Sequence, residues 1–286
     1  MAMADESPSY PRVVLGEEIK RLREESGLNQ TELAQRIGSW QSRIASLEKA
    51  RIKTIKVEFL DAILEVLRVD PARAVELRGF ARTPYGERGV WNAQTWWRGK
   101  LRAEQLAFQI TSVQLEALDG LIHCEGYMRR QFQLEGRIGV SDAVKTRKER
   151  QEVMFGRSPA PKMTFICAQG SLRRSMGDPA MMITQLEHLL ELSRRPQVEV
   201  LIVPDDAHLP TRTYSFSVLR FASKVMTDIA IVENLHGATV IDEVDLADDY
   251  LRRAQFIREH GCLNQFDSRR CIEREIAAHH SALRGK

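Results

Sequence analysis

The spacing of apolar residues over roughly the first eighty positions predicts a set of short helices. Leu15, Ile19 and Leu22 stand at i, i+4 and i+7, which places them on one face of a helix. Gly27 follows where a helix commonly ends on a left-handed residue. The same pattern predicts four more helices, over 29–38, 41–49, 57–67 and 71–81. We therefore expect an all-α, five-helix domain over 13–82, after a polar and disordered lead-in over 1–12.

Beyond this domain the chain alternates between helical and strand patterns. Residues 83–100 hold three tryptophans among glycines and a proline, and disordered segments avoid aromatic residues, so we expect a connector that docks on the second domain. Helical periodicity is found over 104–116, 124–134, 141–155, 179–194, 246–259 and 268–280, and strand-like runs over 163–168, 198–204, 214–221, 229–233 and 238–242. The pattern predicts an α+β domain over 101–286, with a small mixed sheet and flanking helices.

Composition places the chain among ordinary globular proteins and points to no partner by itself. It has 286 residues, of which 43% are hydrophobic and 28% charged, and a net charge of +3. No apolar run is long enough to span a membrane, and the N-terminus lacks the basic start and apolar stretch of a secretory signal. The four cysteines are scattered without a CxxC pair, which is typical of free thiols in a reducing compartment. We expect a cytoplasmic protein without membrane contact.

The segment over 27–48, GLNQTELAQRIGSWQSRIASLE, has the layout of a helix-turn-helix. Two short helices are joined through Gly38, and Ile44 and Leu47 give the second helix an apolar side for the core. The residues exposed between these core positions are polar: Gln41, Ser42, Arg43 and Ser46. Glutamine can pair with the N6 and N7 atoms of adenine, and arginine with O6 and N7 of guanine. The second helix is therefore predicted to contact bases in the major groove.

Residues 15–67 resemble the Cro and phage-repressor (Xre) family of DNA-binding domains, through this motif. The resemblance implies that Gln30 begins the first helix of the motif and contacts a phosphate. It also implies that Gln41, Ser42 and Arg43 face bases, with Ser46 as a further contact.

The chain departs from the Xre pattern just before the recognition helix. Members of the family usually place serine or threonine immediately before the residue that matches Gln41, where this chain has Trp40 preceded by Ser39. Either Ser39 caps a helix that begins one residue earlier, or the cap is lost at a cost of about 1 kcal/mol. The register of Gln41 depends on which alternative holds.

A run of basic residues without an acid follows the recognition helix. It consists of Lys49, Arg51, Lys53 and Lys56. Such a run is usually a solvated face, but beside a recognition helix we expect it to meet DNA phosphates.

A second resemblance covers the chain from about residue 96 to residue 278. The stretches LDGLIHCEGYMRR, RKERQEVMF, GSLRRSMGDPAMMITQLEHLLELSRRPQVEVLIVP and AIVENLHGATVIDE are similar to the C-terminal domain of actinobacterial Xre regulators described as antitoxin-like. Relatives usually have proline at Asp119 and an acidic pair at Gln169 and Gly170. The resemblance implies a regulator that often works with a small companion protein encoded nearby, and it implies no catalytic residues.

Two groups of polar residues are candidates for catalytic or metal sites. Glu233, His236 and Asp242, with His208 before them, could bind a metal or move protons, but polar residues that cap strand ends are the more ordinary explanation. The other group fits the spacing of no closed zinc site: His260, Cys262, Cys271, His279 and His280. No phosphate-binding glycine loop or nucleophile elbow is present. We expect no enzyme, catalytic residue, metal or cofactor.

Together these patterns predict a sequence-specific transcriptional regulator that binds double-stranded DNA. One helix-turn-helix covers about 600–1,000 Å² of DNA contact, which is small for tight specific binding, so a homodimer on two half-sites is expected. The C-terminal domain would then mediate dimerisation and sense a partner protein or ligand. The alternative is an antitoxin-like protein whose main output is binding a small companion protein, with DNA binding serving autoregulation. A third hypothesis, an enzyme tethered to DNA, would require a metal or cofactor that copurifies.

Overall fold

The computed structural model describes residues 7–87, 89–93, 96–174, 176, 178–209, 214–222, 226–234 and 237–284. The chain forms two compact units. The first unit comprises residues 1–106, 221–229 and 234–246, and the second comprises 107–220, 230–233 and 247–286. The predicted fold class is confirmed, because a helical N-terminal region precedes an α+β region with a mixed sheet. None of the helices among the described residues is both long and apolar enough to cross a membrane.

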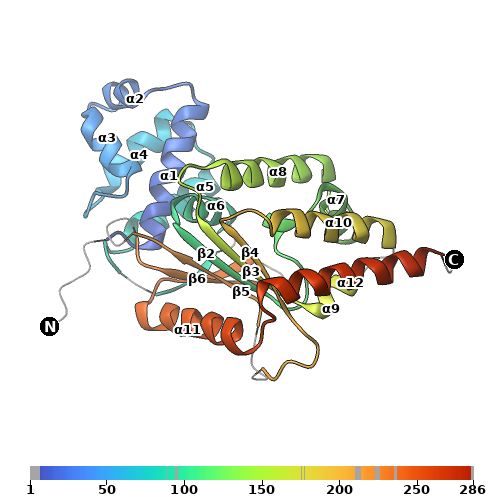
Figure 1. The fold of residues 1–286 in the computed structure, drawn as a ribbon. Helices are drawn as coiled ribbons and strands as arrows, with labels where there is room; N and C mark the ends of the chain where they lie inside the picture. Colours follow the sequence, from blue (N-terminus) through green and yellow to red (C-terminus); the bar gives the residue numbers. More distant parts are fainter. Residues whose placement is uncertain are drawn as a thin grey trace. The chain divides into compact units, whose positions relative to one another are not determined.

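Five helices open the first unit, close to the ranges that the periodicity predicts (Figure 1). They are α1 (Tyr10–Glu25), α2 (Gln30–Arg36), α3 (Gln41–Glu48), α4 (Val57–Val66) and α5 (Pro71–Arg82). Their shared core includes Leu15, Ile19, Leu33, Ile44, Leu47, Leu60, Ile63 and Leu77, all almost completely buried. The helix starts follow from local chemistry. Asn29 and Glu32 form the capping box of α2, and the Asp70 carboxylate accepts two N–H groups at the start of α5, where Pro71 fits the first turn.

Helix α1 crosses the end of α3 at a point where only glycine fits. A Cβ atom on Gly16 would lie 2.7 Å from the carbonyl oxygens of both Leu47 and Glu48. These are backbone atoms of a packed helix, so they cannot move aside as the end of a flexible side chain can. The missing side chain of Gly16 therefore sets how closely α1 approaches α3.

The rest of the first unit joins α1 to segments that are distant in sequence. Strand β1 (Val90–Ala93) pairs antiparallel with β7 (Gly237–Ile241), and α6 (Trp96–Leu106) packs on α1, where Arg102 pairs with Glu17 at 2.8 Å. The buried Asp242 carboxylate accepts the N–H of Tyr10 at 2.9 Å and that of Gly89 at 2.7 Å. Asp242, directly after β7, therefore makes structural hydrogen bonds of the kind that polar residues at strand ends commonly make.

Two sequence expectations in this region are wrong. The disordered lead-in predicted over 1–12 does not extend to residue 12, because α1 begins at Tyr10, and Ser7 and Ser9 before it are buried. The helix predicted over 104–116 is divided, because α6 ends at Leu106 and β2 (Gln109–Gln114) is a strand. The β-branched residues Ile110, Thr111 and Val113 favour an extended chain, and both faces of β2 are covered, so the strand lacks the alternation that would reveal it. Strand β1 and the start of α6 occupy much of the predicted connector. The side chains of Trp91, Trp96 and Trp97 lie outside the described residues, so their predicted docking stays a prediction.

The second unit is built on a mixed sheet. Its strands lie in the order β6-β5-β2-β3-β4, with β2, β3 and β4 parallel and β5 antiparallel to β2. The remaining strands are β3 (Lys162–Ala168), β4 (Val198–Val203), β5 (Phe216–Arg220) and β6 (Ile229–Asn234). The helices are the short η1 (Gly120–Ile122), α7 (Glu125–Leu134), α8 (Val140–Gly156), α9 (Gln169–Arg173), α10 (Pro179–Leu192), α11 (Val244–His260) and α12 (Gln265–Arg284).

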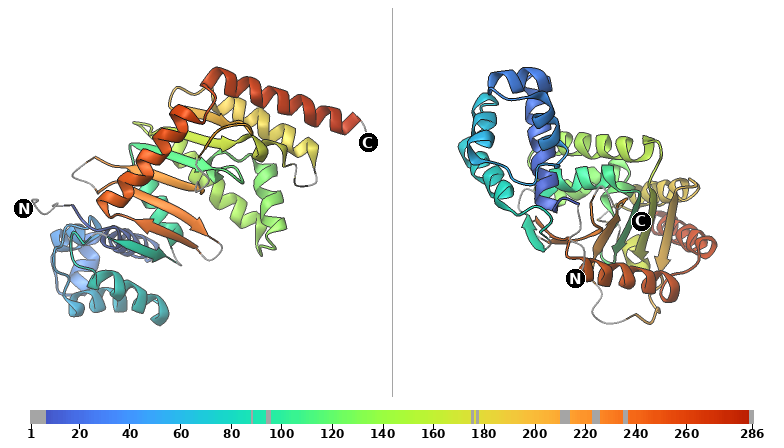
Figure 2. Two further views of the ribbon diagram at one scale, coloured as in Figure 1. Left: turned by 90° about the horizontal axis from the view of Figure 1, so that it is seen from below. Right: turned by 90° about the vertical axis from the view of Figure 1, so that its left-hand side faces the viewer.

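Helices cover both faces of this sheet (Figures 1 and 2). On one face α11 buries Ala254 and Ile257 against Val113, Ile166 and Leu201 of the strands. On the other face lie α8 and α10 (Figure 1), while α12 packs along α10 and against β4.

A buried histidine marks the core beside α8. His123 Nε2 donates to the carbonyl oxygen of Leu118 at 2.9 Å, and Nδ1 accepts from Arg147 Nη1 at 3.2 Å, since a carbonyl can only accept and a guanidinium can only donate. Both ring nitrogens are used in the neutral form. Burial, and after it the nearby Arg147 charge, lower the pKa of His123 to about 3.

Gly16→Ala should destabilise the first unit by about 1–3 kcal/mol, because the added methyl group pushes α1 off the carbonyl groups of α3. Gly79→Ala is the matched control. Gly79 lies within α5 with open space around its Cβ position, so the change should be neutral or stabilise by up to about 1 kcal/mol. Thermal unfolding of the two variants measures the difference. Equal melting temperatures would show that the two helices separate without cost.

The second unit should lose stability as the pH falls from about 6.5 toward 3. In this window the unfolded chain protonates His123 and the folded chain does not, so stability falls by up to about 1.4 kcal/mol per pH unit from this group. His123→Gln should remove that part of the pH dependence, whereas His280→Gln, at an exposed position of α12, should keep it. Urea unfolding at a series of pH values tests this, and a slope unchanged in the His123 variant would contradict it.

Candidate nucleic-acid interface

Helices α2 and α3 pack against each other across a short turn. Gly38 in this turn has a φ of 62°, a left-handed conformation that glycine adopts without strain. Leu33 and Ala34 of α2, and Ile44 and Leu47 of α3, face the core. The polar side of α3 is left toward solvent, as the motif predicts.

The recognition helix begins at Gln41, which settles the question of its cap. Trp40 occupies the N-cap position and makes no capping hydrogen bond with its side chain. The hydroxyl of Ser39 is buried and has no hydrogen-bond partner among the residues that the structure describes. The second alternative is therefore correct: the cap is lost, and Gln41 keeps the register expected from the Xre resemblance.

A chain of hydrogen bonds runs from the protein core to the exposed start of α3. Arg23 of α1 binds the buried Glu48 carboxylate through Nε at 2.6 Å, and Gln30 Nε2 donates to the same carboxylate at 2.7 Å. Gln41 Nε2 then donates to Gln30 Oε1 at 2.6 Å. Because a carboxylate only accepts, it fixes which way the Gln30 amide points, and Gln30 in turn orients Gln41. Within the described part of the chain, the carbonyl oxygen and second N–H of the Gln41 amide make no further hydrogen bond and are open to another partner.

The other predicted base contacts occupy different sides of α3. Ser42 is exposed, and Ser46, one helical turn later on the same side, is partly exposed. Arg43 is partly buried, and its guanidinium carbon lies 3.9 Å from the centre of the Phe59 ring in α4. The structure thus brings Gln30 and Gln41 together but holds Arg43 away from them by a cation–π contact.

The predicted phosphate-binding run is exposed along its whole length. Lys49 follows α3 as its C-cap, Lys56 precedes α4 as its N-cap, and Arg51 and Lys53 lie in the loop between these helices. The exposed side chains leave the cationic groups open to a large anionic partner.

Sequence reasoning did not identify two residues of this site as functional, one exposed and one buried. Trp40 is 74% exposed at the start of α3, and exposing such a large apolar ring to water is unfavourable unless a partner covers it. Its only signal in the sequence is that it breaks the usual cap. Glu48 ends the motif in the sequence without a signal of its own, except that an acid at a position expected to be buried indicates a charged partner.

Two family models match the chain. A helix-turn-helix domain matches residues 14–77. The family described as domain of unknown function (DUF5753) matches residues 97–274, more than half of the chain. The chain belongs to the DUF5753 family.

Other comparisons add little to this assignment. No curated protein is significantly similar to this DUF5753 chain. One similar solved structure is that of TrmBL2, an archaeal chromatin protein whose structure "shows a novel mode of DNA binding". The two sequences are 10% identical, with a TM-score of 0.30 over 85% of this chain and 97% of that one. A likeness this weak supports no argument about how the present chain binds.

The polar groups weighed as metal or catalytic sites are dispersed. Among the described residues, no three His, Cys, Asp or Glu side chains gather closely enough to hold a metal ion. His236 lies outside the described residues. His279 is buried, with Nε2 donating to the carbonyl oxygen of Leu172 at 2.9 Å. All four cysteines are free, and burial raises the pKa of each thiol, to about 12 for Cys262.

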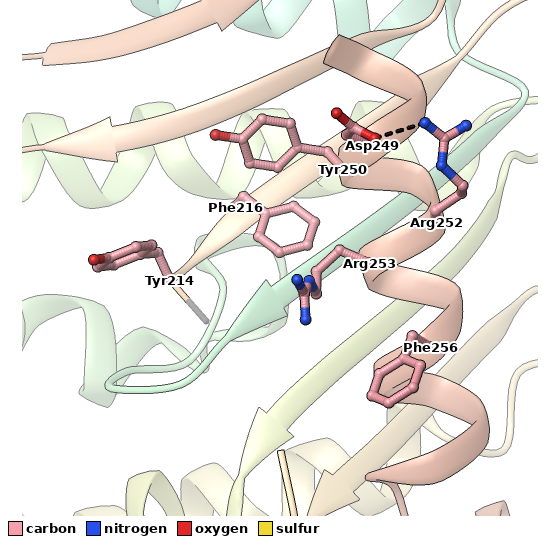
Figure 3. A pocket seen from close by; sticks show the side chains of 7 residues that line it. All are labelled: Tyr214, Phe216, Asp249, Tyr250, Arg252, Arg253 and Phe256. Atoms are coloured by element: carbon pink, nitrogen blue, oxygen red, sulfur yellow. Dashed lines mark hydrogen bonds and ion pairs between the residues drawn. The ribbon is translucent and has the colours of Figure 1, made fainter. Parts of the chain in front are cut away.

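The DUF5753 region holds an aromatic pocket of about 640 Å³ between β5 and α11 (Figure 3). Its walls are formed by Tyr214, Phe216, Asp249, Tyr250, Arg252, Arg253 and Phe256. The rings of Phe216 and Tyr250 meet edge to face, with centroids 5.1 Å apart. Asp249 is engaged by Arg252 at 2.6 Å, while Figure 3 shows Arg253 extending from α11 into the same space.

Glu48→Gln should destabilise the first unit by about 3 kcal/mol or more, because it leaves the Arg23 guanidinium buried without its full counter-charge. Glu65→Gln makes the same charge change at an exposed position of α4 and should alter stability by less than about 0.5 kcal/mol. Urea unfolding of both variants gives the comparison. Equal stabilities would mean that the buried pair does not hold α1 to α3.

Proposed function

We propose that this chain is a sequence-specific transcriptional regulator of the Xre type, which inserts α3 into the major groove of double-stranded DNA. The supporting observation is the side chain of Gln41. It lies exposed at the first turn of α3, and Gln30 fixes its orientation through the buried Glu48. A preoriented amide is suited to adenine, whose N6 and N7 it can bind together.

The proposed contacts divide into those that read bases and those that hold the backbone. Gln41, Ser42 and Ser46 share the accessible side of α3 and would face base edges. Arg43 would reach a base by leaving the Phe59 ring, at a cost of about 0.5–1 kcal/mol for the lost cation–π contact. The backbone contacts would be made by Gln30, Lys49, Arg51, Lys53 and Lys56, which fix position without reading sequence.

A homodimer and a sensing role for the DUF5753 domain complete the proposal. Two recognition helices on two half-sites would supply the contact area that one lacks. The aromatic pocket beside α11 supports a role in sensing, since it is of a size that commonly takes small molecules. A small companion protein encoded nearby is the other candidate effector, and the proposed site of action is the cytoplasm.

Gln41→Ala should relax base preference at one position of the site and weaken specific binding by about 1–3 kcal/mol. Lys56→Ala should weaken specific and random duplexes about equally, because a phosphate contact carries no sequence information. The test is to titrate the full chain with a duplex selected from a random pool, with its single-base variants and with random duplex.

Gln133→Ala, at an exposed position of α7, is the control and should leave every affinity unchanged. A Gln41 variant with wild-type affinity for each single-base variant would contradict the assignment of α3 as the recognition helix. Failure to select any duplex would contradict the proposed function itself.

A further inference from the structure

A second cavity, of about 410 Å³, lies within the first unit at the base of the helix-turn-helix. Its walls come from the first turn of α1, the loop before α4, the start of α4 and the end of α5 with the residues after it. They are Arg12, Lys53, Thr54, Ile55, Val57, Leu60, Arg78, Ala81, Arg82, Pro84 and Tyr85. Nothing in the proposed DNA contacts accounts for this cavity, although Lys53 belongs to both.

The charged groups that line the cavity are all cationic. Arg78 is neutralised by Asp61, at 2.7 Å from Nε. Lys53 and Arg82 are exposed and pair with no acid among the described residues. No carboxylate contributes to the lining, so the cavity holds a concentration of positive charge that its own walls do not balance.

Arg12 is the buried member of this group, only 5% exposed. Its Nε donates to the carbonyl oxygen of Thr83 at 2.8 Å, and Nη2 to that of Lys53 at 3.4 Å. Nη1 is buried and has no hydrogen-bond partner among the described residues. Burial lowers the pKa of Arg12, yet a guanidinium remains charged at neutral pH. A buried charged donor without an acceptor is costly, and an anion in the cavity would supply that acceptor.

The remaining wall is apolar. Leu60 is buried, Val57 is half exposed, and Ile55, Ala81 and Pro84 complete the surface. A bare inorganic ion would leave this wall facing water, whereas an organic group would cover it. Helix α4 also begins here at Val57, where the N-cap residue Lys56 makes no capping hydrogen bond with its side chain; Glu58 lies in the first turn, and this end of the helix favours negative charge.

We propose that this cavity binds a small organic anion, a carboxylate or phosphate monoester attached to an apolar or aromatic group. The anionic head lies against Arg12, Lys53 and Arg82, and the apolar part lies on Val57 and Leu60. A DNA backbone phosphate has the same head-group chemistry but no apolar part, so it matches only half of the lining.

The test uses the full chain, with phenyl phosphate as the probe. Binding is measured by calorimetry in a phosphate-free buffer of low ionic strength. Phenyl phosphate should bind at one site per chain, and both benzyl alcohol, which lacks the charge, and inorganic phosphate, which lacks the ring, should bind at least about tenfold more weakly. Either compound binding as tightly as phenyl phosphate would overturn the proposal.

Matched variants locate the site. Arg82→Gln and Lys53→Gln change exposed side chains, so the fold should persist, and each should weaken phenyl phosphate binding about tenfold. Arg51→Gln and Lys49→Gln each remove one positive charge from the basic run outside the cavity. They should leave the affinity for phenyl phosphate unchanged. Arg12→Gln should abolish binding, but it also removes contacts to Thr83 and Lys53, so the exposed variants decide the outcome. Equal effects of all four exposed variants would overturn the proposal.

A titration with duplex DNA distinguishes a free organic anion from a DNA backbone phosphate as the group that occupies the cavity. With random duplex DNA, Arg82→Gln should leave the slope of log K against log salt unchanged if the cavity takes a free anion. A slope reduced by about 0.9, together with no binding of phenyl phosphate, would assign the cavity to a backbone phosphate and overturn the free-ligand proposal. If Arg82→Gln changed neither the binding of phenyl phosphate nor the salt dependence of duplex binding, the proposal would also be overturned.

Discussion

The buried carboxylate of Glu48 is the interaction on which the proposed interface depends. It stands at the end of α3 and receives Arg23 from α1 and Gln30 from α2, so three helices meet at one charge. Burying an ion pair is costly unless its remaining lone pairs are satisfied, and here the Gln30 amide supplies a third hydrogen bond to the carboxylate beside the two from Arg23. The same bond that satisfies the core thereby orients Gln30, and Gln30 orients Gln41 at the surface. Glu48 can occupy this place only because Gly16 lets α1 approach the end of α3.

Sequence periodicity was sufficient for elements that have one polar face. The five helices of the first unit follow their predicted ranges closely, because helical spacing marks which side is buried. Strands β3 and β4 are buried on both faces for most of their length, and they were predicted as apolar runs of strand length and not from alternation. Periodicity failed at β2, where all four inner residues are buried and the apolar pattern fits helix and strand alike. The Asn29 capping box was also readable from the sequence, since it depends on residues three apart.

The candidate sites show the limit of the same reasoning. Exposure of Gln41 and Ser42 could be predicted, because it depends only on the side of α3 opposite Ile44 and Leu47. The stacking of Arg43 on Phe59 could not, since it depends on the distance between α3 and α4. The cationic cavity was equally hidden. Its charges come from three segments, α1, the loop before α4 and α5, spread over about seventy positions, and each residue alone resembles an ordinary surface cation.

The two family matches and the two compact units divide the chain differently, and Asp242 explains why. Asp242 lies within the DUF5753 match at 97–274, yet its carboxylate accepts the N–H of Tyr10, the first residue of α1. The first N–H groups of a helix have no acceptor inside the helix, so this carboxylate satisfies one of them. Its negative charge also interacts favourably with the positive end of the helix dipole. Arg12 lies two residues further on in the same turn. The first turn of α1, which also carries Arg12 of the cavity wall, is therefore held by a residue of the C-terminal family match, and that segment, 234–246, belongs to the first compact unit.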